Sequence, residues 1–299
     1  MDLLLSIFSS TLIFILFRSF PKYKVDTLQA VVANYFVAFT CGIMLFSNDL
    51  IALKNQEIMS ASPFAFLCGV LFISLFVIMG ISSQKNGVAT TSIAVKMSMA
   101  LSVLFVLIAQ FNAINFNTII PLILALAGVF LVSYQGKTKE GSGSVWMLGV
   151  LFLGSACLDL VLFFVQDSWL PDFHQGIFAS LGFGMAGCLG LLYLTYLRFQ
   201  KKLVFDPRSW LGGIVLGIPN YFSIYLLVRA YSSMGVEPQQ VLSIANVGVV
   251  LASALAGFLL FKEPFSWKKG WGMVLCLLAL SLSVISFEEI LQLTIRIFV

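Results

Sequence analysis

The sequence of 299 residues predicts an all-α membrane protein in which ten transmembrane helices form two inverted five-helix repeats around a central cavity. Three observations support this fold class. Hydrophobic residues make up 60% of the chain and charged residues only 10%, whereas soluble domains contain roughly 25% charged residues. Short polar segments divide the chain into apolar stretches of about the 20 residues that a helix needs to cross a bilayer. Part of the first half also recurs in the second.

The boundaries of the ten helices follow from the residues that interrupt the apolar stretches. Glycine, proline, asparagine and aspartate gather in short connections, and all five tryptophans lie near helix ends, where indole rings favour the headgroup layer. No signal-peptide cleavage site follows the first stretch, so we expect it to remain as a helix. The predicted helices span residues 2–20, 27–47, 62–83, 88–110, 117–135, 145–167, 174–198, 209–231, 238–261 and 268–287.

The repeat is visible in short matching segments. Ser92-Ile93-Ala94 recurs as Ser243-Ile244-Ala245, 151 positions later. The most polar linker, residues 137–144, separates a first repeat of residues 1–136 from a second of residues 145–299. Because each repeat has an odd number of spans, the second enters the membrane from the opposite side. Such inverted repeats are typical of transporters with a site near the midplane, and a purely structural duplication is the alternative.

Basic residues predict the orientation of the chain. The connections after the first, third, fifth, seventh and ninth helices carry thirteen Lys and Arg, and the other connections carry three. The positive-inside rule places the basic side in the cytoplasm and both termini outside. We therefore expect a multi-pass protein of the cell inner (plasma) membrane. The thirteen are Arg18, Lys22, Lys24, Lys85, Lys137, Lys139, Arg198, Lys201, Lys202, Arg208, Lys262, Lys268 and Lys269.

Lys96 interrupts the apolar stretch from Gly87 to Gln110. It lies about eight residues into the predicted helix, near mid-depth of a hydrocarbon core of about 30 Å. A charge there costs about 2.5–3.5 kcal/mol on insertion scales, so such residues usually face a wet cavity or a partner. We interpret Lys96 as a ligand for a substrate carboxylate or phosphate. The alternative is a lysine whose stem reaches back to the interface.

Asp159 is the acidic residue at a comparable depth, in the predicted helix 145–167. Two interpretations are open. The carboxylate either exchanges protons during transport, which makes protons the coupling ion, or forms a fixed ion pair with Lys96 that serves structure alone.

Other polar residues are predicted to complete a binding site near the midplane. Pro219 interrupts the helix 209–231, and broken helices in mid-membrane mark binding sites in transporters. We expect Asn220 and Tyr221 there; the alternative is a packing kink in which Asn220 bonds to a neighbouring helix. Asn246 lies beside the repeat mate of Lys96. The remaining candidates are polar side chains on neighbouring predicted helices: Ser92, Ser243, Gln240 and Asn34.

The sequence predicts no enzyme and no cofactor. His174, the single histidine, lies in a loop near Asp167 and Asp172, where solvated loop charges are the simplest explanation. The chain contains no nucleophile motif, phosphate loop or metal-ligand spacing, and its five cysteines are dispersed through apolar stretches. The net charge of +4 is dispersed and predicts no nucleic-acid partner.

Three segments carry a family resemblance: the run from Gln84 to Ser98, the run from Gly217 to Ser223, and Phe261-Lys-Glu-Pro-Phe-Ser-Trp267. With these, the chain resembles the drug/metabolite transporter superfamily, and specifically its ten-helix EamA-like branch, over essentially its whole length. The third segment resembles the acidic turn before the last helix, and we expect Glu263 to cap or orient it. The chain departs from the family in having Asn112 where the first repeat usually has a glutamate, and in the predicted outside position of its termini.

The resemblance implies a basket of helices 1–4 and 6–9 around a central cavity, with helices 5 and 10 at the periphery. Substrates of the superfamily range from amino acids to nucleotide sugars and cationic drugs. With Lys96 in the cavity, we expect a secondary active transporter that moves a small polar, anionic or zwitterionic metabolite across the inner membrane by alternating access, as an exporter or exchanger. The alternatives are a lipid-linked sugar translocase and a non-transporting membrane scaffold or sensor.

Overall fold

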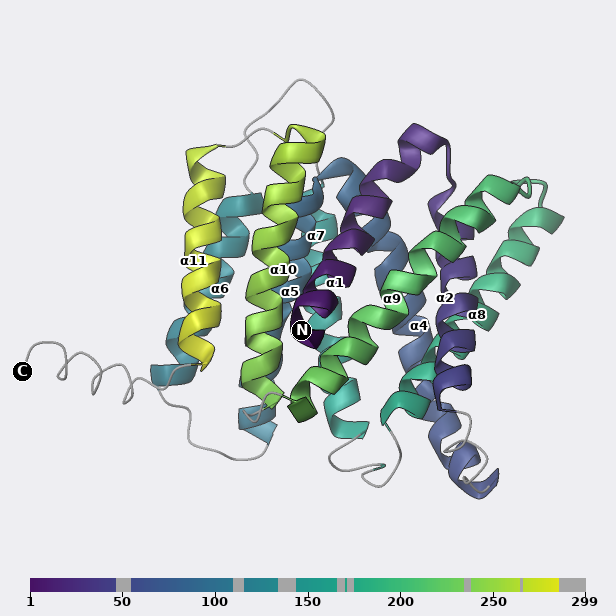
Figure 1. Ribbon diagram of the computed structural model, residues 1–299, viewed down its shortest axis with the longest axis horizontal. Coiled ribbons are helices and arrows are strands. Elements are labelled where there is room, and N and C mark those ends of the chain that lie inside the picture. Colours follow the sequence, from purple (N-terminus) through teal and green to yellow (C-terminus); the bar gives the residue numbers. More distant parts are fainter. Residues whose placement is uncertain are drawn as a thin grey trace, which may run out of the picture.

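The structure, a computed structural model, describes residues 1–46, 55–109, 116–133, 144–165, 170, 175–233, 238–263 and 266–284. In these residues all regular structure is helical, and no strand is present. The elements are α1 (Asp2–Ser19), the 3-10 helix η1 (Phe20–Tyr23), α2 (Thr27–Leu45), α4 (Asn55–Lys85), α5 (Val88–Ala109), α6 (Phe116–Ser133), α7 (Val145–Phe164), α8 (Gln175–Phe199), α9 (Pro207–Ser233), α10 (Pro238–Phe261) and α11 (Trp267–Val284) (Figure 1).

Most of these helices begin and end within two or three residues of the predicted positions, and the exception is α4. The sequence predicts a start at residue 62, but α4 begins at Asn55 and contains Pro63. Pro63 lacks the N–H that would bond to the carbonyl of Met59. The Ser62 hydroxyl donates to that carbonyl at 2.9 Å instead, so the helix continues past the proline.

Eight helices in the described part of the chain are long and apolar enough to cross a membrane. The apolar stretches of α6 and α11 are shorter, at Ile119–Leu131 and Gly270–Ala279. The prediction of an all-α, multi-pass membrane protein is therefore confirmed at this level. The ten-span inverted repeat, with its division at residues 137–144, stays a prediction; residues 134–143 lie outside the described residues.

The helices pack as two bundles with a seam between them (Figure 1). In bundle A, which consists of α2, α4, α8 and α9, α2 contacts the other three helices and α4 contacts α8. Bundle B consists of α5, α6, α10 and α11. Helices α1 and α7 lie in the seam, because α1 contacts α4 and α9 of bundle A and α5 and α10 of bundle B, while α7 contacts α4 and α5. The seam is therefore where groups from both bundles meet.

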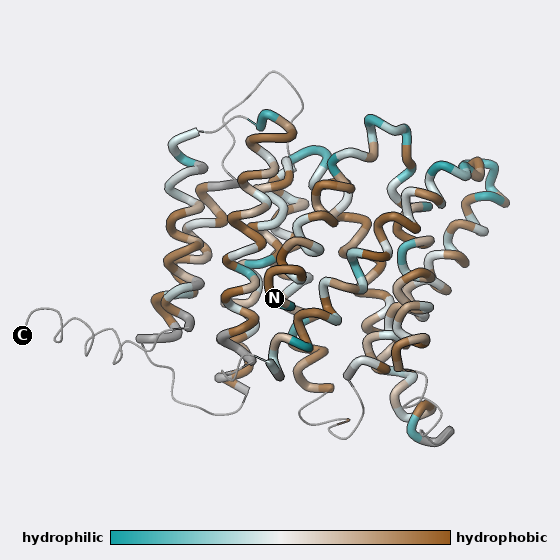
Figure 2. The backbone as a smooth tube through the Cα atoms, viewed as in Figure 1, coloured by the Kyte–Doolittle hydropathy of each residue, from teal (hydrophilic) through white to brown (hydrophobic). Residues whose placement is uncertain are grey.

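The described Lys and Arg residues of the connections lie mainly at one end of the helices, which we call the basic end. The connections α1–α2, α8–α9 and α10–α11 lie along the upper edge of Figure 2, where hydrophilic residues gather. The α4–α5 connection lies there too, since Arg18 donates to the carbonyl of Gln84, and the Gln84 amide donates to the Thr27 hydroxyl at 2.8 Å. At the opposite end, Arg229 pairs with Asp2 at 3.3 Å.

Candidate functional site

Lys96 and Asp159 both lie inside apolar helices. Lys96 is in the third turn of α5 and is half-buried, whereas Asp159, on α7, is exposed by surface area. Asp159 continues the α7 face on which Leu148, Phe152 and Ser155 are buried, because residues three and four apart share one face of a helix. The accessible carboxylate therefore faces the protein interior and not the lipid.

The Asp159 carboxylate is surrounded by polar groups of α5. The Ser102 hydroxyl lies within hydrogen-bond distance of its Oδ2 atom at 3.3 Å, and of the Ser98 and Ala156 carbonyls at 3.1 and 3.3 Å. The Ser98 hydroxyl, one turn earlier, also lies near the carboxylate, and it donates to the Val95 carbonyl of its own helix at 2.7 Å. Lys96 and Asp159 attract each other electrostatically, but in the described part of the chain no ion pair within 4.0 Å joins them. The two charges therefore interact across a gap wider than a contact ion pair.

Tyr231, in the last turn of α9, also interacts electrostatically with Asp159. We call Lys96, Ser98, Ser102, Asp159 and Tyr231 the charged cluster. Its residues come from α5 of bundle B, α7 of the seam and α9 of bundle A. Sequence reasoning found its two charges and missed the rest. The available signal for the serines was their spacing of four residues, which places both on one face of the same helix as Lys96.

Asn246 and Ser243 of α10 lie elsewhere, at the contact between α10 and α5. Both side chains donate to the thioether sulfur of Met99, Asn246 at 3.2 Å and Ser243 at 3.8 Å, and both are buried. Ser92 is buried too and donates to the carbonyl of Ala89 in its own helix at 2.9 Å. These predicted binding residues thus make contacts within bundle B. The side chain of Gln240 lies outside the described residues.

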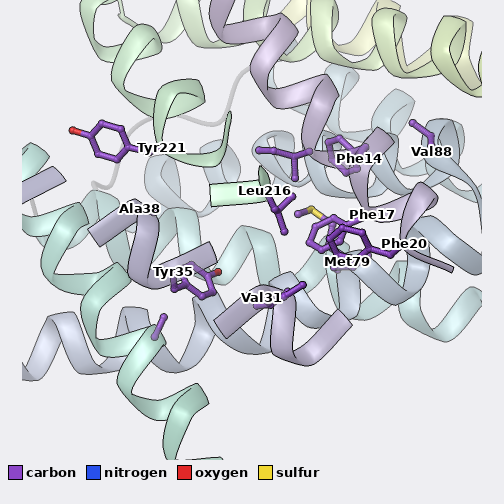
Figure 3. Packing of buried hydrophobic residues seen from close by; sticks show 14 of the residues in the cluster. Phe14, Phe17, Phe20, Val31, Tyr35, Ala38, Met79, Val88, Leu216 and Tyr221 are labelled. Atoms are coloured by element: carbon purple, nitrogen blue, oxygen red, sulfur yellow. The ribbon is translucent and has the colours of Figure 1, made fainter. Parts of the chain in front are cut away.

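Asn34, Asn220 and Tyr221 form a third group, at the contact between α2 and α9 inside bundle A. All three side chains are at most 5% exposed, and Asn34 is fully buried. Both amide atoms of Asn34, the Nδ2 of Asn220 and the hydroxyl of Tyr221 have no hydrogen-bond partner in the described structure. Figure 3 shows the Tyr221 hydroxyl directed away from the other labelled side chains.

A close approach of the two helices places this third group. A Cβ atom on Gly213 would lie 2.3 Å from the carbonyl oxygen of Ala30, and one on Gly217 would lie 2.9 Å from that of Asn34. The pair of glycines four residues apart lets the α9 backbone rest on α2, as small residues at this spacing do in membrane helices. The residues that the sequence predicts to form one site therefore lie at three separate places in the fold: in the seam, in bundle B and in bundle A.

The described residues contain no cluster of three or more His, Cys, Asp or Glu side chains with metal-binding geometry. His174, Asp167, Asp172 and Asn112 lie outside the described residues. In the described part of the chain, the charged cluster is therefore the one candidate site that combines opposite charges with an accessible interior carboxylate.

No family model matches the chain. It is 28% identical to an uncharacterized protein from Haemophilus influenzae over 287 residues, which cover 93% of this chain and 96% of the relative. It is also 23% identical over 186 residues to a protein from Pyrobaculum aerophilum named undecaprenyl-diphosphatase, covering 58% of this chain and 70% of that protein. The chain is a polytopic membrane protein whose described regular structure is helical, and it is similar over 93% of its length to one bacterial protein and over 58% to a protein named undecaprenyl-diphosphatase.

Proposed function

We propose that the protein is a secondary active transporter that moves a small polar, anionic or zwitterionic metabolite by alternating access. The observation that carries this proposal is the charged cluster at the seam. Charged side chains inside a membrane are costly and usually face a water-filled path or a binding site. In this protein an accessible carboxylate and a half-buried lysine lie where groups from both bundles meet.

The pattern of helix contacts supports an inverted repeat of the drug/metabolite transporter type. In that arrangement α1, α2, α4, α5 and α6 correspond to α7, α8, α9, α10 and α11. Exchanging the two sets turns the α2–α9 contact into α8–α4, the α1–α10 contact into α7–α5, and the α1–α9 contact into α7–α4, all of which are present. The contacts α5–α10 and α6–α11 map onto themselves. A site between two such repeats is reached alternately from each side as they rock.

The chemistry of the cluster defines the roles of its residues. The Lys96 ammonium supplies three hydrogen-bond donors and a positive charge for a substrate carboxylate or phosphate. Asp159 balances that charge while the site is empty, and it can release or take up a proton when substrate replaces it beside Lys96. Ser98, Ser102 and Tyr231 supply hydroxyl groups that can bond to the Asp159 carboxylate or to the substrate. Nothing in this scheme breaks a covalent bond, so the proposal includes no enzymatic activity.

Ligand-induced stabilisation of the purified protein in detergent tests the proposal. A ligand that binds only the folded state raises the melting temperature, by an amount set by its concentration relative to Kd. We expect one or more anionic or zwitterionic metabolites to raise the Tm of the native protein and to lose this effect in Lys96→Ala. Lys85→Ala, which removes an exposed lysine at the end of α4, is the matched control and should keep the response.

Two results would contradict the proposal. The first is an equal response to the metabolite in Lys96→Ala and the native protein. The second is a stabilising metabolite that the protein fails to move into proteoliposomes, which would make it a sensor and not a transporter.

A second candidate substrate class is favoured by the relative named undecaprenyl-diphosphatase. A polyprenyl phosphate or diphosphate presents the same anionic chemistry to Lys96 on a lipid anchor. Undecaprenyl phosphate therefore belongs in the same panel. Stabilisation by undecaprenyl phosphate and not by soluble phosphates would favour translocation of a lipid-linked substrate. If the protein released inorganic phosphate from undecaprenyl diphosphate, its function would be hydrolysis and not transport.

A further inference from the structure

The seam is closed at the basic end by apolar side chains. Phe14 and Phe17 of α1 and Phe20 of η1 pack with Met79 of α4 and Val88 of α5 in one cluster, and each is at most 7% exposed (Figure 3). Asp159 of the charged cluster lies further from the basic end and is exposed, so it is on the other side of these apolar side chains. The structure is therefore closed between the charged cluster and the basic end.

The connection between α4 and α5 links the two bundles at this closed end. Helix α4 of bundle A ends at Lys85 and α5 of bundle B begins at Val88, so only Asn86 and Gly87 join them. Gly87 has a φ of +96°, in the left-handed region that favours glycine. Such short connections are where hinges absorb the φ/ψ change of a domain motion. A small rotation here would move the first turn of α5 relative to α4.

Glu263 holds that first turn. The left-handed Lys262, with φ of 51°, turns the chain after α10, and the Glu263 N–H bonds back to the carbonyl of Gly257 at 3.0 Å. The Glu263 Oε1 atom then accepts the N–H of Val88 at 2.7 Å. The first N–H groups of a helix lack partners within it, and a carboxylate is stabilised there by the helix dipole. Glu263 is thus a cap supplied from one helix connection to the start of another helix.

The carboxylate is enclosed as well as bonded. A Cβ atom on Gly87 would lie 2.7 Å from both carboxylate oxygens, and one on Gly257 would lie 2.7 Å from Oε2. Gly87, just before α5, and Gly257, within α10, therefore leave room for Glu263 between the two helices. A substitution at either glycine displaces the carboxylate without removing its charge.

We propose that Glu263 is the clamp that keeps the basic end closed. By capping α5 it holds the Asn86–Gly87 connection in the closed geometry, and its release lets the first turn of α5 move away from the apolar cluster, which opens a path from the basic end to the charged cluster. The proposal rests on the alternating-access function above, but it concerns access and not substrate.

A thiol reporter at Val88 tests the clamp. In a background with the five native cysteines replaced by alanine, Val88→Cys places a thiol inside the apolar cluster. The probe is a charged maleimide that cannot cross the membrane, added to right-side-out or inverted vesicles. Applied to the basic end, it should label the Val88→Cys thiol slowly while Glu263 is present. We expect labelling about 10-fold faster in Glu263→Ala, the factor by which loss of a typical cap shifts a local equilibrium.

Two further variants and one control sharpen the result. Glu263→Gln, whose amide oxygen can still accept the Val88 N–H, should label at an intermediate rate, and Gly257→Ala should label faster than the parent because its methyl group displaces the carboxylate. Asp26→Ala is the matched control, because Asp26 caps its own helix α2 at the same end, accepting the Gln29 N–H at 2.9 Å. It should lower the Tm without changing the labelling rate.

Three outcomes would overturn the proposal. Fast labelling with Glu263 in place would mean that the basic end is open. Slow labelling in Glu263→Ala would mean that another contact closes it. Faster labelling in Asp26→Ala, or from the opposite face as well, would indicate general loosening of the fold. No substrate is used, so these outcomes are independent of the ligand panel that tests transport.

Discussion

The charged cluster in the seam and the α2–α9 contact in bundle A both place polar side chains inside apolar helices, and they do so in opposite ways. In the cluster, Asp159 is accessible and lies within hydrogen-bond distance of the Ser102 hydroxyl. At the α2–α9 contact, Asn34 is fully buried, and its amide atoms have no partner in the described structure. The ionised carboxylate thus has a hydroxyl group beside it and is accessible, whereas the neutral amide is enclosed without a hydrogen-bond partner.

This difference indicates that one site serves function and that the other mainly affects stability. A buried polar group without a partner costs about 1–3 kcal/mol, so the unpaired amide atoms of Asn34 at the α2–α9 contact lower the stability of this conformation. The charged cluster avoids the larger penalty of an unpaired ion by remaining accessible and balanced. Changes in the cluster should therefore affect ligand binding most, and changes at the α2–α9 contact should affect stability most. Variants of each region test this division.

The largest effect is expected from breaking the charge balance. Asp159→Ala leaves Lys96 without its opposite charge, and we expect the free energy of unfolding to fall by about 1–3 kcal/mol, less than for a fully buried pair because the carboxylate is accessible. The double variant Lys96→Ala, Asp159→Ala should recover much of this loss and still fail to bind the metabolite. Unfolding and ligand-shift measurements on all four proteins form a double-mutant cycle. Recovery of binding in the double variant would reduce both charges to a structural role.

The next effect is expected at Asn34. Asn34→Leu keeps the branching of the side chain and removes both unpartnered amide atoms, so we expect stability to rise by about 1 kcal/mol. Asn86→Leu is the matched control, because the Asn86 amide donates to the Ser82 hydroxyl at 2.9 Å and to the Ser144 carbonyl at 3.4 Å. It should lose about 1–2 kcal/mol. A loss in Asn34→Leu as large as in Asn86→Leu, measured by thermal unfolding in detergent, would show that the Asn34 amide has a partner such as a bound water.

The sequence could predict what local chemistry determines. Breakers such as Pro21 and Gly87 separate the apolar stretches, so nine of the ten helices begin close to their predicted positions. Lys96 and Asp159 were found because a charge inside an apolar stretch is visible without knowing any neighbour. The predicted start of α4 was wrong because the helix continues from the apolar stretch into the polar residues before it, where the Ser62 hydroxyl bonds to the Met59 carbonyl that Pro63 leaves without an N–H donor.

The sequence could not predict which helices meet. Ser102 and Tyr231 are ordinary residues for membrane helices, and only the packing of α5, α7 and α9 brings them to Asp159. The repeat places Asn246 one position from the counterpart of Lys96, but at the contact of α5 with α10 its amide donates to the Met99 sulfur. Pairing between helices depends on side-chain shape along the whole contact, and no single spacing along the chain records it.

The smallest effect on stability is expected from two buried tyrosines, one with a hydrogen-bond partner for its hydroxyl group and one without. The Tyr35 hydroxyl donates to the carbonyl of Phe72 at 2.8 Å, whereas the Tyr221 hydroxyl has no partner in the described structure, and both side chains are buried. Tyr35→Phe should lower the free energy of unfolding by about 1 kcal/mol. Tyr221→Phe should leave it unchanged or raise it by about 0.5 kcal/mol, because it removes an unpaired group without making a cavity. Equal losses in the two variants would place a hydrogen-bond partner at Tyr221. Unchanged stability with weaker metabolite binding in Tyr221→Phe would instead place this residue in the binding site that the sequence predicts. A hydroxyl group with no partner in the protein is available to bond to a ligand.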